Sequence, residues 1–274
     1  MKIIISIIIL LTFITCQSII RPIPNIELNA PKENSNNNWL TKTNVKSVKD
    51  VPTIQPVISN FPDLTPSVIK LRIAEQEEFE SLMDTSIPYD QMTPKQKEMV
   101  GNELYYMAGP FSTQEEGCSW YCAGGVYDIT ATSTLNSEKD DAYKPLNIHD
   151  FDLRTAWVEG DKEYGIGEKI NFIFKMNSGL KVTDLEIYNG YCKSEKLWKD
   201  NSRVKTFGMY INGILTYKLS LNDTYKCQSF KIGSYNCNKE QDLILTLEIL
   251  EIYPGDKYKD VVISEVNFDG TGSH

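Results

Sequence analysis

Histidine is almost absent from this sequence, and its scarcity excludes whole classes of chemistry. Among 274 residues there are two histidines, His149 and the C-terminal His274. A Ser-His-Asp or Cys-His site needs an imidazole beside the nucleophile, and zinc sites draw mainly on cysteine and histidine. His149 stands between Ile148 and Asp150, with no nucleophile that spacing alone could place beside it. We therefore predict that the protein is not an enzyme.

An excess of positive charge is also missing. The chain has 28 Lys and Arg residues against 37 Asp and Glu residues, which gives a net charge of −9. Nucleic acids and anionic lipid surfaces both attract basic proteins through their phosphate groups. We therefore expect no nucleic-acid partner and no electrostatic attachment to a membrane.

No apolar run is long enough to cross a membrane comfortably, since a spanning helix needs about 20 apolar residues. Residues 3–14 follow Lys2 and form the apolar middle of a signal peptide over residues 1–15. Cys16 comes directly behind, as in bacterial lipoproteins whose cysteine becomes the lipidated first residue. The alternative is an ordinary signal peptide with an incidental cysteine. We expect export to the cell envelope, as an outer-membrane or surface lipoprotein held to the membrane by its lipid anchor.

Five cysteines remain after Cys16. In an exported protein they are better candidates for disulfides than for metal ligands. Cys227 and Cys237 flank a short polar connection, and we predict a disulfide between them. Because five is an odd number, at least one thiol is left over.

The segment from residue 16 to residue 65 has the composition of a disordered linker. It contains half of the chain's 12 prolines, an asparagine run at 36–38 and no sustained apolar period. Such a composition cannot bury enough surface to offset its ordering entropy. A leash of this length spans roughly 40 Å.

Residues 66–112 predict a helical segment. Thr65-Pro66 and Thr93-Pro94 each place an N-cap before a proline at the first helical position. Gln96, three residues after Thr93, can complete a capping box. The second helix should run to about residue 107, before Gly109.

From residue 113 to residue 274 the pattern is that of strands. The alternation of apolar and polar residues, rich in β-branched and aromatic types, predicts strands at 126–135, 169–175, 182–188, 204–211, 214–221, 243–252 and 261–268. Asn212-Gly213 predicts a two-residue hairpin turn. No βαβ spacing separates these strands, so the fold class is all-β, a jelly-roll β-sandwich preceded by the short helical segment.

One acidic cluster could hold calcium. Asp150, Asp152 and Thr155 crowd a single loop, and Glu265 lies in the last predicted strand. Calcium takes six to eight oxygen ligands from carboxylates, hydroxyls and carbonyls. If the loop and the strand are neighbours, these four residues could share a structural calcium ion. The alternative is a hydrogen-bonded turn without metal.

Aromatic and polar residues near the predicted strand ends favour carbohydrate binding. Aromatic rings stack on the C–H faces of sugars, while amide and charged groups bond to the hydroxyls, and loops usually carry such sites. Trp198 and Tyr258 stand in lysine-rich surroundings that predict exposure, whereas Trp157 could instead fill the core. The candidate ligand-binding residues are Trp157, Tyr191, Trp198, Asn201, Arg203, Tyr253, Lys257 and Tyr258.

Several short motifs occur together in an informative order. They are Thr-Ala-Trp-Val-Glu-Gly at 155–160, Gly-Ile-Gly-Glu at 165–168, Asn-Gly-Tyr at 189–191, Asn-Ser-Arg-Val-Lys at 201–205, Tyr-Pro-Gly-Asp-Lys-Tyr-Lys-Asp at 253–260 and Ile-Ser-Glu at 263–265. Over residues 118–268 the chain resembles the glycan-binding, discoidin-like domain (coagulation-factor type C-like) of a secreted streptococcal NAD glycohydrolase. The resemblance implies a galactose-binding-like jelly roll that binds glycans without catalysis. The family's Asp-Gly-Asp loop has Phe151 in place of glycine here.

The sequence thus predicts a non-catalytic glycan-binding module of an exported, lipid-anchored protein. Two other hypotheses remain. One is a structural lipoprotein whose sandwich docks another envelope protein. The other is a glycan hydrolase that uses Asp150, Asp152 and Glu159 as its acids.

Overall fold

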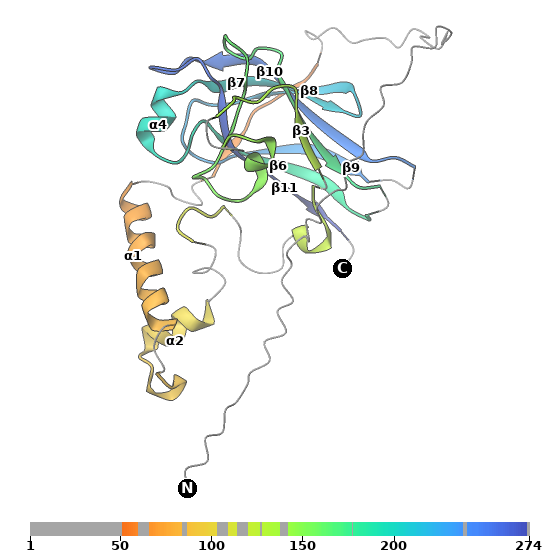
Figure 1. Ribbon diagram of the computed structural model, residues 1–274. Helices are drawn as coiled ribbons and strands as arrows, with labels where there is room; N and C mark the ends of the chain where they lie inside the picture. Colours follow the sequence, from red (N-terminus) through yellow and green to blue (C-terminus); the bar gives the residue numbers. More distant parts are fainter. Residues whose placement is uncertain are drawn as a thin grey trace, which may run out of the picture. The chain divides into compact units, whose positions relative to one another are not determined.

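Two β-sheets pack face to face in the computed structural model (Figure 1). The structure describes residues 51–59, 66–83, 87–102, 109–113, 120–126, 128–137, 142–176, 178–237 and 240–272. The predicted signal peptide, the lipidation site at Cys16 and most of the predicted linker lie outside these residues. None of the helices in this part of the chain is long and apolar enough to span a membrane.

The first sheet has six strands and the second has five. The order in the first is β1 (Thr53–Ile54), β8 (Ile214–Ser220), β7 (Arg203–Ile211), β10 (Leu243–Tyr253), β5 (Lys169–Phe174) and β3 (Asp128–Ala131). The order in the second is β2 (Val57–Ile58), β9 (Gln228–Asn236), β6 (Lys181–Asn189), β11 (Val262–Thr271) and β4 (Trp157–Val158). The predicted jelly-roll sandwich is confirmed.

Alternation along the strands builds the core between the sheets. In β5, Ile170, Phe172 and Phe174 are buried while the residues between them face outward. Because side chains of a strand point alternately to opposite faces, the apolar half of each strand is removed from water. The predicted hairpin between β7 and β8 is also confirmed, since Asn212 and Gly213 both have positive φ, 47° and 80°.

The predicted helical segment is present as α1 (Pro66–Met83) and α2 (Pro94–Gly101), with the 3-10 turn η2 (Tyr89–Gln91) between them. Two further 3-10 turns, η3 (Trp120–Ala123) and η4 (Pro145–His149), lie later in the chain. The capping box before α2 is confirmed, with Thr93 and Gln96 exchanging hydrogen bonds. This helix ends at Gly101, earlier than expected. Phe79, Leu82 and Met99 form the apolar contact between α1 and α2.

The prediction of a disordered linker over residues 16–65 is wrong for residues 51–59. Strand β1 pairs in parallel with β8, and β2 pairs antiparallel with β9. A single short stretch therefore adds to one edge of each sheet. Ile54 also packs against the main core. Hydrogen bonds to two sheet edges and apolar contact order a stretch that has no periodic pattern of its own.

The predicted disulfide between Cys227 and Cys237 is also wrong. The connection that separates them is strand β9, which the sequence did not predict. Ten residue steps of extended chain at about 3.3 Å each place the cysteines roughly 30 Å apart. The two sulfur atoms are not joined in the structure, and each is buried in a different apolar cluster.

Candidate ligand-binding site

Four loops meet at one end of the sandwich. They are the β4–β5 loop (159–168), the β6–β7 loop (190–202), the β8–β9 loop (221–227) and the β10–β11 loop (254–261). The register that pairs Tyr253 with Arg203 places the end of β10 beside the start of β7. A backbone hydrogen bond from Glu159 to Val261 joins the first loop to the fourth. We call this the loop end of the sandwich.

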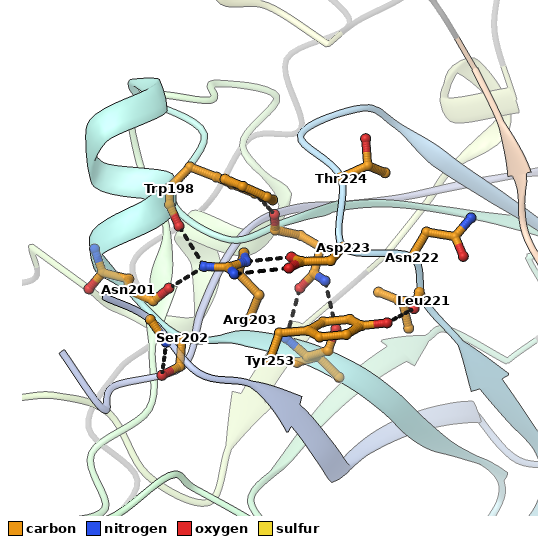
Figure 2. A network of polar contacts seen from close by, with 12 residues as sticks. Trp198, Asn201, Ser202, Arg203, Leu221, Asn222, Asp223, Thr224 and Tyr253 are labelled. Atoms are coloured by element: carbon orange, nitrogen blue, oxygen red, sulfur yellow. Dashed lines mark hydrogen bonds and ion pairs between the residues drawn. The ribbon is translucent and has the colours of Figure 1, made fainter. Parts of the chain in front are cut away.

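Arg203, the first residue of β7, is the centre of a polar network at the loop end (Figure 2). Its Nε and Nη2 atoms bond to the two carboxylate oxygens of Asp223, at 2.7 and 3.2 Å. Its Nη1 atom donates to the carbonyl oxygens of Trp198 and Asn201, at 2.9 and 2.8 Å. Arg203 is 6% exposed. One buried guanidinium therefore fixes the β6–β7 loop against the β8–β9 loop.

Trp198 belongs to the short helix α4 (Glu195–Asp200), which Ser194 caps. Its ring centroid lies 4.2 Å from the guanidinium carbon of Arg203, and its Nε1 atom donates to the carbonyl of Asn189 at 2.8 Å. A Cβ atom on Gly190 would lie 2.6 Å from Trp198 Cδ1. The indole is thus half-buried and held by the network.

The side chains of Asn201 and Tyr253 make further hydrogen bonds at the loop end. The Asn201 side chain bonds to the carbonyl of Leu197 at 2.8 Å and ends α4. The Tyr253 hydroxyl donates to the carbonyl of Leu221 at 3.0 Å and connects β10 to the β8–β9 loop. Tyr191 is half-buried in a separate small apolar cluster.

Three of the predicted ligand-binding residues are buried in the structure. Trp157 is fully buried in the core, where its Nε1 atom donates to the carbonyl of Ser133 at 3.1 Å. Arg203 and Asn201 are buried with their polar groups bonded internally. The burial and internal partner of each side chain argue against direct contact with a ligand.

Two predicted residues remain open to solvent on the β10–β11 loop. Tyr258 is 40% exposed, and the Nζ atom of Lys257 lies 4.6 Å from its ring centroid. A hydrogen bond with Tyr258 raises the pKa of Lys257. The backbone of this loop is fixed, since the amide nitrogens of Lys257 and Tyr258 bond to the carbonyl of Asp200 and Ser202 Oγ bonds to the carbonyl of Tyr258. An aromatic ring and a cation therefore stand together on a held loop.

The sequence did not single out the β8–β9 loop, although it is held as firmly. Gln228, which is fully buried, bonds to both the amide and the carbonyl of Asn222, at 2.7 and 3.0 Å. The Tyr225 hydroxyl donates to the carbonyl of Cys192. Asn222 and Asp223 are exposed. The sequence shows only polar turn residues here, which do not distinguish a site from an ordinary turn.

Glu159 lies at the base of the β4–β5 loop and is fully buried. Its carboxylate accepts hydrogen bonds from the amides of Asp161 and Val261, at 2.6 and 3.2 Å. Gly165, with φ of 60°, passes so close that a Cβ there would lie 2.6 Å from the Glu159 carboxyl carbon. Burial raises the pKa of Glu159 to about 6, against the effect of these hydrogen bonds.

The structure brings together three of the four predicted calcium ligands. The Thr155 hydroxyl lies 2.8 Å from both carboxylate oxygens of Asp150, and the Asp150 amide donates to Glu265 Oε1 at 3.0 Å. Asp152 is instead held by Arg154. Phe151 has φ of 62°, the backbone conformation that glycine adopts most easily.

The remaining oxygen of this cluster, Glu265 Oε2, is buried without a hydrogen-bond partner. Burial raises the pKa of Glu265 well above its usual range, and the nearby Asp150 adds to the effect. Within the described residues, no group of three or more His, Cys, Asp and Glu side chains is placed to hold a metal. The cluster thus contains the carboxylates of Asp150 and Glu265 and the Thr155 hydroxyl, which are ligand types that calcium takes.

A family model matches residues 120–269, and its description is the NAD glycohydrolase translocation F5/8 type C domain. The match covers more than half of the chain. The chain belongs to this family. The F5/8 type C match includes all four loops at the loop end and both sheets, apart from β1, β2 and the last two residues of β11.

Solved structures give more distant similarities to this F5/8 type C chain. The CBM32-1 and CBM32-2 domains of Clostridium perfringens ZmpB in complex with GalNAc share 11% identity and a TM-score of 0.40, over 70% of this chain and 52% of that one. CBM32-1 from a family 31 glycoside hydrolase of Clostridium perfringens shares 10% identity and a TM-score of 0.35, over 53% of this chain and 96% of that one. The chain thus spans about half the length of the ZmpB structure. These similarities are too distant to transfer a ligand. A comparison with curated protein sequences yields no match.

Proposed function

We propose that this F5/8 type C chain is a non-catalytic carbohydrate-binding protein and that its loop end holds the glycan. The observation that carries the proposal is the exposed ring of Tyr258, with the Lys257 ammonium over one face. Such a ring offers a face for the C–H side of a sugar, and the ammonium offers a donor for its oxygens. Because the loop backbone is already fixed, binding loses little conformational entropy.

The surroundings of His149, Glu159 and Asp150 support a role without catalysis. His149 is partly buried and bonds to the carbonyl of Val266 at 2.7 Å, and burial lowers its pKa to about 4. Glu159 is buried with both carboxylate oxygens bonded to backbone amides. Asp150 bonds to Thr155 and contacts Glu265 in another cluster. These contacts do not pair Glu159 with Asp150 across a shared open surface, as hydrolysis would require.

The proposal includes a structural calcium ion. Asp150, Thr155 and Glu265 would hold it, and the ion would neutralise the buried Glu265 carboxylate. It would act by fixing the loop before β4. Asp152 is outside this set because its carboxylate is bound to Arg154.

Export and lipid attachment complete the proposal. Cys16 directly behind the apolar run of residues 3–14 supports a lipid anchor in the cell envelope. Metabolic labelling with a radioactive fatty acid tests it, with Cys16→Ser as the control that should lose the label.

The glycan site is tested by replacing one exposed tyrosine. Tyr258→Ala should weaken glycan binding at least tenfold while the thermal unfolding temperature stays the same, because the ring is partly in solvent. Tyr89→Ala is the matched control, since Tyr89 is 62% exposed but belongs to the helical segment. Equal binding by both variants and the wild type would exclude Tyr258 from the site.

Protein docking is the second candidate, and one observation favours it. Ile214 is 72% exposed, Met176 is 42% exposed and Ile244 is 37% exposed. Ile214 begins β8, Ile244 lies at the start of β10, and Met176 follows the end of β5, so all three lie at the end of the sandwich opposite the loop end. Exposed apolar side chains of this kind are common at protein interfaces. Co-purification of a stoichiometric envelope protein that Ile214→Asp abolishes would support this candidate.

A further inference from the structure

The β8–β9 loop is unusually well held for a connection on the surface. Its backbone is fixed at Leu221 by Tyr253 and at Asn222 by the buried Gln228. The carboxylate of Asp223 is held in place by Arg203. A loop that only connects two strands needs none of these side-chain bonds. Side chains locked by buried partners are instead typical of binding loops.

Three consecutive side chains of this loop, Asn222–Thr224, carry oxygen atoms, and the half-buried Tyr225 and the exposed Lys226 follow them. Asn222 has an amide, Asp223 a carboxylate and Thr224 a hydroxyl, and the Asp223 side chain is 39% exposed. In Figure 2 the side chains of Asn222 and Thr224 project from the loop and are not part of the drawn network. The Asn222–Thr224 segment therefore offers a polar edge.

The pairing with Arg203 determines what Asp223 can bind. Each carboxylate oxygen accepts one bond from the guanidinium and retains a further lone pair. Arg203 also compensates the charge, so a hydroxyl donor can approach without leaving an unpaired charge behind. A carboxylate or sulfate brought up to the Asp223 carboxylate would meet only lone pairs on that group, because an ionised carboxylate donates no hydrogen. The geometry suits a ligand with neighbouring hydroxyl groups and no negative charge.

We propose that the Asn222–Thr224 segment is a second binding edge of the loop end, specific for uncharged sugars whose hydroxyls donate to Asp223. This inference rests on the proposed function, because it names the ligand class of that site. Arg203 is a positioning residue in this account. It does not touch the sugar but fixes the acceptor that does.

The test uses the full chain and a panel of immobilised glycans. The panel contains glycans that end in neutral hexoses or N-acetylhexosamines, and matched glycans that end in sialic acid, uronic acid or a sulfated sugar. The wild type should bind neutral members in preference to acidic ones. Asp223→Asn should weaken binding about tenfold or more, since a hydrogen bond to a charged group contributes at least that factor.

Two further variants keep the test decisive. Asn222→Ala removes an outward amide and leaves the backbone bonds to Gln228 in place, so it should fold normally and still weaken binding. Asp90→Asn makes the same chemical change as Asp223→Asn on an exposed residue of the helical segment, and it should bind like the wild type.

The outcomes separate the two proposals. Glycan binding that survives both Asn222→Ala and Asp223→Asn, or a preference for acidic glycans, overturns this inference and leaves the proposed function intact. A folded wild type that binds no member of the panel overturns the proposed function itself.

Discussion

Both carboxylate oxygens of Asp223 accept hydrogen bonds from Arg203, which lies 20 positions earlier in the chain. The pair joins the start of β7 to the loop that leads into β9. Neither residue type is unusual, and each alone would be expected in solvent. Together they organise the loop end on which the proposed function depends.

The shape of the arginine side chain should matter more than its charge. Arg203→Lys keeps the charge but loses the forked bonds to Asp223 and the bonds to two carbonyl groups. We expect the free energy of unfolding to fall by about 2 kcal/mol, measured by urea denaturation. Lys205, on the same strand as Arg203, makes an exposed ion pair with Glu251 of β10. Lys205→Ala removes this pair and should change the free energy of unfolding little. Equal stability of Arg203→Lys and the wild type would contradict the role given to the network.

Gly190 should be needed for its missing side chain. It has φ of 95°, and a Cβ there would lie 2.6 Å from Trp198 Cδ1. Gly213 has φ of 80° and no atom within 4 Å of the same position. Gly213→Ala should therefore cost only the backbone strain of about 1 kcal/mol. Gly190→Ala should cost at least about 1 kcal/mol more and shift Trp198 fluorescence. Similar losses for the two variants would show that Trp198 is not tightly packed.

Glu159 should make stability depend on pH. Its pKa is about 6, raised from 4.5 in the unfolded chain, so the folded state binds more protons between these values. The sign follows directly: this contribution to the free energy of unfolding is fully present below about pH 4.5 and is lost as pH rises through about 6.

The measurement compares the wild type with Glu159→Gln by thermal unfolding near pH 4.5 and near pH 7.5. The variant loses a carboxylate that accepts two amides, so it should be less stable at both values. The part of the pH dependence that Glu159 causes should disappear from it. A difference between the two proteins that does not change with pH would show that Glu159 has an ordinary pKa.

Calcium should stabilise the protein through Asp150. Millimolar calcium should raise the thermal unfolding temperature of the full chain by several degrees relative to a chelator, because a ligand bound only by the folded state stabilises it. Asp150→Asn should abolish the shift. Asp152→Asn should keep it, since the Asp152 carboxylate is bound to Arg154. No shift in the wild type would favour the hydrogen-bonded turn without metal.

Strong local patterns made most of the fold predictable from the sequence. Alternating Ile170, Phe172 and Phe174 marked β5, and Asn212-Gly213 marked a hairpin whose φ values only such residues adopt easily. Strand β9 was missed because its buried residues, Gln228, Phe230 and Ile232, include a polar side chain and are followed by Gly233. Strands of two residues such as β1 and β2 cannot show a period at all.

The candidate site was predictable only in part, for a different reason. The sequence placed candidate residues on the β6–β7 and β10–β11 loops but none on the β8–β9 loop. Of the two rings expected to be exposed, Tyr258 is exposed and Trp198 is half-buried. The sequence could not separate Arg203 as a buried residue, because that depends on Asp223 in a loop with no distinctive motif. Trp157 shows the same limit, since an aromatic residue beside polar ones suits a core as well as a binding surface.

Direct binding of the full-length chain to a glycan array tests the central claim. The account predicts reproducible binding to a defined class of glycans, reduced by Tyr258→Ala and unchanged by Tyr89→Ala. An empty array from a protein shown to be folded by circular dichroism and cooperative unfolding would contradict it, and the exposed apolar residues around Ile214 would then become the surface to test.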